Sequence, residues 1–512
     1  MFGGLLKSTS LAALVAVAGV AISGSSAQAA DLGGNCCADL EERIAELEAT
    51  TARKGNRKVS LTISGQVNQS VLFWDDGVTK NAYVTDNEAS RNRVRFLGSA
   101  KIDASWSAGY LLELGVRGNR QDTVSQAQTY TTGPNNTEAA PSKILNGGAD
   151  NGVGSKVVDV RHSVWWLSNK DLGKVWLGVT SDAADGITEI NLANTGHFAT
   201  PQMQDYINGF TLRKNGVLLN NAAKGIDNNT KAFTYSSLWN GSRSGANPGE
   251  GDRFNVVKYD TPTIAGFIGS ASWGENDQWA VGLRYAGEFS GFKLAAGIAY
   301  SDVTDGYDIS SSTNLAQNGA RGCAKVLGPA NTTGSDVSCN ELGLSASLMH
   351  VPTGLFVTGA YGQKKDDNRV LLDPAIRSKD EFYYVQGGIE QKFFPVGKST
   401  FFGEYYNGKF GPVNVTPALG DTTAGSLTQT LTAASGLTTA FGSAATLTAL
   451  NSSVEIWGVG FNQNIEAAAM DIYVAYRNVS SDATFRQSGT NSISKQSFDD
   501  FQYVTTGAVI KF

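Results

Sequence analysis

Arginines at alternating positions form the pattern in this sequence that most suggests chemistry. Arg91, Arg93 and Arg95 are separated by single residues, and side chains alternate between two faces of an extended strand, so the three share one face. Arg117 and Arg161 occupy the polar face of two further alternating stretches. Together they predict a basic wall that sets an electric field in the space it faces.

Acidic residues follow soon after another strand-like stretch. Asp182, Asp185 and Glu189 begin a long segment after residues 174 to 180. If this segment lies opposite the arginines, the two sets of charges create a transverse field across a narrow passage. Alternatively, these charges pair locally or face solvent, and the sequence leaves both possibilities open.

The sequence gives little support for an enzyme. The chain has three histidines, His162, His197 and His350, and strand alternation predicts that His162 lies on the lipid or interface side rather than beside a nucleophile. There is no G-x-S-x-G nucleophile motif and no Cys/His cluster with metal-ligand spacing. We therefore predict no enzyme activity, no metal and no cofactor.

The elements that must position the charges are strands with a two-residue period. In residues 59 to 68, for example, apolar Val59, Leu61 and Ile63 alternate with polar residues. We predict sixteen strands: 59–73, 91–103, 106–117, 157–168, 174–180, 253–261, 266–274, 279–288, 292–301, 341–350, 355–362, 380–392, 398–407, 453–463, 468–478 and 499–512.

The connections between these strands differ in length according to strand parity. Links after even-numbered strands are tight, as at 104–105 and 289–291, whereas most links after odd-numbered strands are long, as at 118–156 and 181–252. The link 275–278 is short and breaks the rule once. Short turns on one side and long loops on the other are typical of an antiparallel outer-membrane barrel, in which closure also satisfies every backbone hydrogen-bonding group.

Both ends of the chain fit an exported barrel. Lys7, the apolar run from Leu11 to Ile22 and Ala27-Gln28-Ala29 predict a signal peptide over residues 1–29. The chain ends in an amphipathic strand with Phe512 at its tip, which resembles the closing strand of a bacterial outer-membrane barrel. No later stretch of eighteen apolar residues predicts a membrane helix, and a net charge of −6 implies no nucleic-acid surface.

Residues 30–58 should form a periplasmic amphipathic helix and linker before a barrel domain at 59–512. Leu40, Ile44 and Leu47 recur with spacings of four and three, which indicates a short apolar seam. A helix of about two heptads is only marginally stable alone, so other protein must cover its apolar seam. The helix could be a trimerising periplasmic stub, or it could be an amphipathic plug or a frayed arm. The sequence leaves both possibilities open.

The cysteines suit an oxidising compartment. Cys323 and Cys339 lie in one Gly/Asn/Ser-rich loop with fifteen residues between them, and we predict a disulfide bond there. Cys36 and Cys37 are adjacent, and could cross-link neighbouring chains or stay reduced.

Three segments carry a family resemblance: Cys36–Glu48, Val59–Gly65 and Lys174–Asp182. With the strand and loop order of the whole mature chain, they resemble the alphaproteobacterial outer-membrane porins of rhizobial type. The resemblance implies a sixteen-stranded trimeric barrel whose third loop folds into the lumen and narrows it. The chain differs from that family in loop length and in the Thr/Ala/Gly/Ser-rich stretch 421–450.

These observations predict an all-β, sixteen-stranded antiparallel transmembrane barrel with short periplasmic turns, long outer loops and a short N-terminal helix, in a Gram-negative outer membrane. The expected function is passive diffusion of small hydrophilic solutes and ions, with a pore constriction formed by Arg93, Arg95, Arg117, Arg161, Asp182, Asp185 and Glu189. Outer-membrane lipid and other copies of the chain, as a homotrimer, are its expected partners. The alternative is a surface adhesin or receptor barrel without an open channel.

Overall fold

The computed structural model describes residues 59–126, 157–219, 233–239, 247–305, 336–367, 369–372, 374–411, 428–430, 437–441, 446–487 and 489–512. The chain divides after Lys58 into two units, and the first, Met1–Lys58, lies outside the described residues. The predicted signal peptide, N-terminal helix, Cys36 and Cys37 all fall in that first unit. The second unit, Val59–Phe512, is described below.

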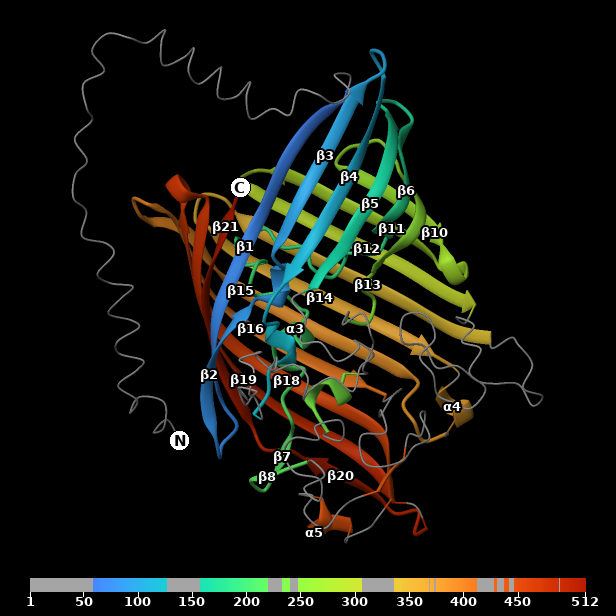
Figure 1. Ribbon diagram of the computed structural model, residues 1–512, viewed down its shortest axis with the longest axis vertical. Coiled ribbons are helices and arrows are strands. Elements are labelled where there is room, and N and C mark those ends of the chain that lie inside the picture. Colours follow the sequence, from blue (N-terminus) through green and yellow to red (C-terminus); the bar gives the residue numbers. More distant parts are fainter. Residues whose placement is uncertain are drawn as a thin grey trace, which may run out of the picture. The chain divides into compact units, whose positions relative to one another are not determined.

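Sixteen antiparallel strands form the wall of the second unit (Figure 1). The last wall strand pairs with the first, from Gln66 opposite Lys511 to Asp75 opposite Gln502, so the sheet closes into a barrel. The wall strands are β1 (Ser60–Asp75), β3 (Arg93–Lys101), β4 (Trp106–Arg117), β5 (Val157–Asn169), β6 (Gly173–Ser181), β9 (Arg253–Asp260), β10 (Phe267–Gly274), β11 (Trp279–Phe289), β12 (Phe292–Asp305), β13 (Asp336–His350), β14 (Leu355–Asp366), β15 (Lys379–Phe394), β16 (Gly397–Phe410), β18 (Thr446–Ile465), β19 (Met470–Gln487) and β21 (Phe501–Lys511).

The predicted sixteen-stranded barrel is therefore confirmed. Several strands are longer than expected: β18 begins at Thr446 rather than 453, and β13 begins at Asp336 rather than 341. These extensions continue the same antiparallel pairing beyond the stretches with clear apolar alternation.

Shorter elements lie between the wall strands. The strands are β2 (Lys80–Asp86), β7 (Arg213–Lys214), β8 (Val217–Leu218), β17 (Thr428–Thr430) and β20 (Ile493–Ser497). The helices are α3 (Gln204–Ile207), α4 (Arg369–Leu372) and α5 (Thr438–Phe441), with single 3₁₀ turns at η2 (Glu88–Ser90), η3 (Gln121–Thr123), η7 (Tyr235–Ser237), η8 (Glu275–Asp277) and η10 (Glu466–Ala468). Among the described residues, no helix has the length and apolar character needed to cross a membrane.

The two faces of the wall differ in polarity. On β1, Leu61 and Ile63 are more than half exposed on the outside, whereas Asn68 and Ser70 are buried on the inside. An apolar outer face suits hydrocarbon, and a polar inner face suits water or polar protein groups. The predicted strand alternation thus decides which side chains of the wall face outward and which face the lumen.

The carboxyl-terminal residue completes the closure of the barrel. The backbone N–H of Gly65 donates to the carbonyl oxygen of Phe512 at 2.8 Å, and the N–H of Phe512 donates back to Gly65 at 3.1 Å. A Cβ at position 65 would lie 2.6 Å from Cζ of Phe512. The backbone oxygen of Arg93 would lie 2.5 Å from that Cβ and cannot move aside as an exposed ring can, so only glycine fits at this close approach.

The predicted disulfide bond concerns β13. Cys339 is buried and disulfide-bonded, opposite Val303 on β12. Its predicted partner, Cys323, lies outside the described residues. The pairing of Cys323 with Cys339 therefore stays a prediction.

Candidate functional site

The segment after β6, which is the third long link between wall strands, runs along the inside of the wall. Backbone groups of residues 183 to 198 bond successively to inward side chains of β10, β13, β15, β18, β19 and β1. The partners are Ser272 (3.0 Å to Ala183), Ser345 (3.2 Å to Ile190), Ser347 (3.0 Å to Leu192), Glu390 (2.8 Å to Asn194), Asn462 (2.9 Å to Asn194), Arg477 (3.2 Å to Phe198) and Asn68 (2.9 Å to His197). Because the wall is closed, a segment that touches these strands in turn lies in the lumen.

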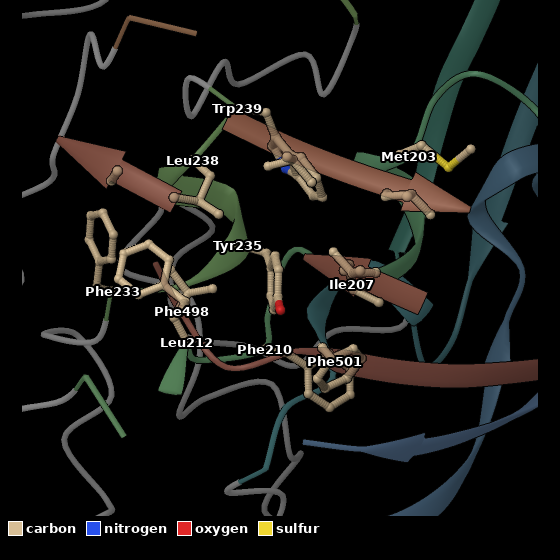
Figure 2. Close-up of a cluster of buried hydrophobic side chains, with 14 of the residues drawn as sticks. Met203, Ile207, Phe210, Leu212, Phe233, Tyr235, Leu238, Trp239, Phe498 and Phe501 are labelled. Carbon is tan, nitrogen blue, oxygen red and sulfur yellow. The ribbon is translucent and has the colours of Figure 1, made fainter. Parts of the chain in front are cut away.

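The continuation of this third loop packs as an apolar core inside the barrel. Loop residues such as Phe210 and Tyr235 contact Phe501 of β21, with ring centroids 4.8 and 5.6 Å apart (Figure 2). The loop members of the cluster include Met203, Tyr206, Ile207, Phe210, Leu212, Phe233, Tyr235, Leu238 and Trp239. Burial of this many apolar side chains is strongly favourable in water, so protein rather than solvent fills this part of the lumen.

A fully buried ion pair joins the third loop to the wall. Nε of Arg477 on β19 lies 2.6 Å from Oε1 of Glu404 on β16, and both side chains have no exposed surface. The guanidinium also lies 4.4 Å from the ring centroid of Tyr206 in α3 and donates to the carbonyl oxygen of Phe198. Arg477 therefore fixes two points of the loop at once.

A polar cavity of about 300 Å³ lies between the third loop and the wall. Arginines on its lining come from β3, β5, β9 and the residue range just before β3, and carboxylates come mainly from the third loop. The charged lining residues are Arg91, Arg93, Arg161 and Arg253 on one hand, and Glu88, Asp185, Glu189, Asp205, Glu250 and Asp252 on the other. Charges of opposite sign thus face a common space.

One buried carboxylate contacts three of the arginines of the wall. Glu113 on β4 has no exposed surface, and its oxygens lie 2.7 Å from Nε of Arg161, 2.7 Å from Nε of Arg95 and 3.9 Å from Nη1 of Arg93. Three positive charges share one negative charge, so the group keeps a surplus of positive charge. Glu113 was not among the residues predicted from the sequence, although its position between Leu112 and Leu114 puts it on the face opposite the two leucines.

The cavity contains four of the seven predicted constriction residues. Arg93, Arg161, Asp185 and Glu189 line it, and Arg95 lies beside it through Glu113. Among these groups Asp185 pairs with Arg253 at 2.9 Å, a partner that sequence analysis did not name.

The other two predicted residues do not line this cavity. Arg117 pairs with Asp159 on the neighbouring strand at 3.0 Å. Asp182 is buried, and its carboxylate accepts the backbone N–H groups of Ala184 at 2.9 Å and Asp185 at 2.8 Å, which forms the turn that starts the loop. Local pairing, the alternative left open by the sequence, describes these two side chains.

The prediction for His162 is wrong. Glu113 of β4 pairs with His162 of β5, whereas the next residue, Leu114, pairs with Val160. Arg161 is therefore an extra residue in β5, that is, a β-bulge. An extra residue reverses the alternation beyond it. His162 consequently lies on the lumen side, buried, with Nδ1 3.0 Å from the hydroxyl of Thr180.

Burial changes the proton affinity of the loop carboxylates. Removal from water raises the pKa of Glu88 and of Glu189 to about 7 and that of Asp252 to about 6. The same cause raises the pKa of Asp205 and Glu250 well above the usual range. Burial thus makes each of these carboxyl groups easier to protonate than a carboxyl group in water.

Comparison with known proteins agrees with this architecture. The family described as Gram-negative porin matches residues 10–484. No curated protein matches the chain in sequence.

Solved structures with similar folds share little sequence with the chain. They include the anion-selective porin from Comamonas acidovorans (14% identity, TM-score 0.45, 89% of this chain and 100% of that chain), OmpT, an outer membrane protein of Vibrio cholerae (10%, 0.44, 90% and 99%), and Salmonella typhi OmpF in complex with daunomycin (12%, 0.41, 89% and 98%). The family match, in contrast, spans nearly the whole chain. This chain belongs to the Gram-negative porin family.

Proposed function

We propose that solutes cross this outer-membrane diffusion pore through a narrow passage between the third loop and the arginine-bearing strands. The observation that carries the proposal is the polar cavity, in which Arg93 and Arg161 of the wall face Asp185 and Glu189 of the loop. Opposed charges in a water-filled constriction orient polar solutes and select among ions. The apolar core of the loop supports the same route, because it fills another part of the lumen.

Planar-bilayer recording of the purified protein tests this function. We expect discrete conductance steps that scale with salt concentration, because a permanent aqueous path carries ions passively. Protein denatured by boiling in detergent before addition is the control. A receptor or adhesin barrel would insert without conducting, so intact, inserted protein without channels would refute the proposal.

The constriction is also expected to involve Asp182, Arg95 and Arg117 only indirectly. Asp182 shapes the start of the loop, Arg95 shares Glu113 with Arg93 and Arg161, and Arg117 pairs with Asp159. Asp182 and Arg95 therefore support groups nearer the passage, whereas the pair of Arg117 with Asp159 lies apart from the cavity lining. No catalytic step is proposed, and membership in a porin family favours a channel over an enzyme.

We further propose that the chain is a porin of the alphaproteobacterial, rhizobial type. The segments Cys36–Glu48, Val59–Gly65 and Lys174–Asp182 support this subgroup. In the same proposal, residues 1–29 are a signal peptide and residues 30–58 a periplasmic helix and linker. Mass spectrometry of the outer-membrane form should find its amino terminus at Ala30, and an intact Met1 would contradict the assignment.

A homotrimer is proposed as the assembled state. The seam at Leu40, Ile44 and Leu47 supports it, since a short helix of this kind gains stability when identical helices cover it. Unboiled detergent samples should migrate as trimers in electrophoresis and boiled samples as monomers. If unboiled samples migrate only as folded monomers, the proposal fails.

A further inference from the structure

Two lysines lie on the inner face of the wall at the end with the short turns. Lys174 is the second residue of β6, close to the turn between β5 and β6, and Lys258 lies two residues before the end of β9. The strand register places Lys174 opposite Asp260, and Trp176 opposite both Lys258 and Trp166. The neighbouring Val175 and Val257 are exposed on the lipid side, so the alternating side chains point into the lumen. These are the side chains of Lys174, Trp176, Lys258, Asp260 and Trp166. Short turns mark the periplasmic end of an outer-membrane barrel.

Indole rings hold the two ammonium groups. Nζ of Lys174 lies 3.6 Å from the ring centroid of Trp176 and 4.1 Å from that of Trp166, and Nζ of Lys258 lies 5.4 Å from the Trp176 centroid. Cation–π contacts fix the positions of both charges without neutralising them. Within the described ranges, neither ammonium group makes a hydrogen bond or an ion pair with a protein oxygen.

A carboxylate beside the lysines, that of Asp260, is already engaged. Oδ2 of Asp260 accepts the Nε1–H of Trp176 at 2.7 Å, and Oδ1 accepts the hydroxyl of Ser270 at 2.7 Å. These bonds hold both carboxylate oxygens of Asp260 on Trp176 and Ser270. The two ammonium groups therefore have no direct ion pair with this carboxylate among the described residues, and both keep their positive charge.

A third cation links this pair to the cavity. Arg284 of β11 donates from Nη1 to the carbonyl oxygen of Ala183 at 3.0 Å and from Nη2 to that of Asp185 at 2.8 Å. Its guanidinium is thus bonded to the start of the third loop, whose Asp185 side chain lines the cavity. Positive charge continues from the lysine pair to the arginines of the constriction.

We propose that Lys174 and Lys258 form a binding station for small oxyanions, carboxylates or phosphate, at the periplasmic end of the passage. The station rests on the proposed function, since it acts on solutes that cross the pore. Each ammonium group has three N–H donors, and none of them has a protein acceptor among the described residues. An oxyanion supplies such acceptors together with the opposite charge, and charge-assisted bonds of this kind are strong.

Block of the chloride current by oxyanions tests the station. Succinate or inorganic phosphate is added to one side of a bilayer that holds the intact porin, and the concentration that halves the current is measured for each. In the wild type, block should be stronger from the periplasmic side. In the double variant Lys174→Met/Lys258→Met, we expect that concentration to rise about tenfold, which corresponds to the loss of roughly 1.4 kcal/mol of attraction.

Matched variants separate local charge from net charge and from folding. Lys170→Met/Lys495→Met removes the same charge from two exposed side chains and should leave the block unchanged. Lys174→Arg/Lys258→Arg keeps the charge and should restore block. A change for only one probe identifies carboxylate or phosphate as the preferred oxyanion and supports the station.

Two results would separate failure of the station from failure of the pore. Channels that conduct normally and show the same block in Lys174→Met/Lys258→Met as in the wild type would overturn the station and leave the proposed pore intact. Wild-type protein that inserts without conducting would overturn both.

Discussion

Replacing Arg477 with methionine is expected to destabilise the barrel by about 3–5 kcal/mol. The guanidinium has no exposed surface and lies 2.6 Å from Glu404, so its removal leaves a buried carboxylate without a counter-charge. The variant also loses the contact with Tyr206 and the hydrogen bond to Phe198, which hold the third loop. The free energy of unfolding, from urea titration in detergent followed by tryptophan fluorescence, measures the effect.

A second substitution identifies the cause of this loss. Arg477→Met/Glu404→Gln removes the uncompensated charge, and Tyr384 can still donate to the new side chain in place of Glu404. We expect the double variant to recover most of the lost stability while the loop remains less firmly held, with a larger and noisier conductance. Lys392→Met breaks an exposed pair with Glu466 and should change stability by less than about 1 kcal/mol. Equal losses in Arg477→Met and Lys392→Met would contradict the assigned role.

Neutralising the arginine group together with its carboxylate is expected to shift ion preference toward cations. The variant Arg93→Gln/Arg95→Gln/Arg161→Gln/Glu113→Gln removes three positive charges and one negative charge beside the passage, a net change of −2. Ions in a constriction feel charges within about 8 Å at physiological salt, so this change outweighs more distant ones. The reversal potential in a salt gradient, at constant pH, measures the shift.

Glu113 must be included in that variant. The three arginine substitutions alone would leave a fully buried carboxylate unpaired, at a cost of about 3–5 kcal/mol, and a folding defect would then obscure the selectivity. The control is Arg117→Gln/Asp159→Asn, which removes an ion pair that does not line the cavity and changes no net charge. If the fourfold variant and the control give the wild-type reversal potential, the arginines do not set selectivity.

The strand count and the orientation of most side chains could be predicted because the strand period is local. Leu61 and Ile63 on the outside, and Arg93 and Arg95 on the inside, follow from alternation over a few residues. The bulge at Arg161 could not be predicted in this way. A bulge depends on how two strands pair, and its effect on His162 appears only when β4 and β5 are side by side.

Local sequence patterns likewise could not predict the position of the third loop. Residues 203–239 contain many apolar side chains without a sustained period of two or of 3.6 residues, so neither a strand nor a long helix could be inferred. Their partners, such as Phe501 and Tyr503, are several hundred residues away in the chain. The resemblance to a family implied a loop in the lumen, but not the apolar core that it forms.

Residue period and chain length were enough to predict the sixteen-stranded wall, the parity of its short and long links and the presence of a basic face. They could not predict which charged side chains contact one another. Glu113 collects Arg93, Arg95 and Arg161, Asp185 pairs with Arg253, and Arg117 is paired elsewhere. Barrel closure and the path of the third loop set these distances, because electrostatic pairing depends on separation in space, which residues far apart in the chain do not reveal.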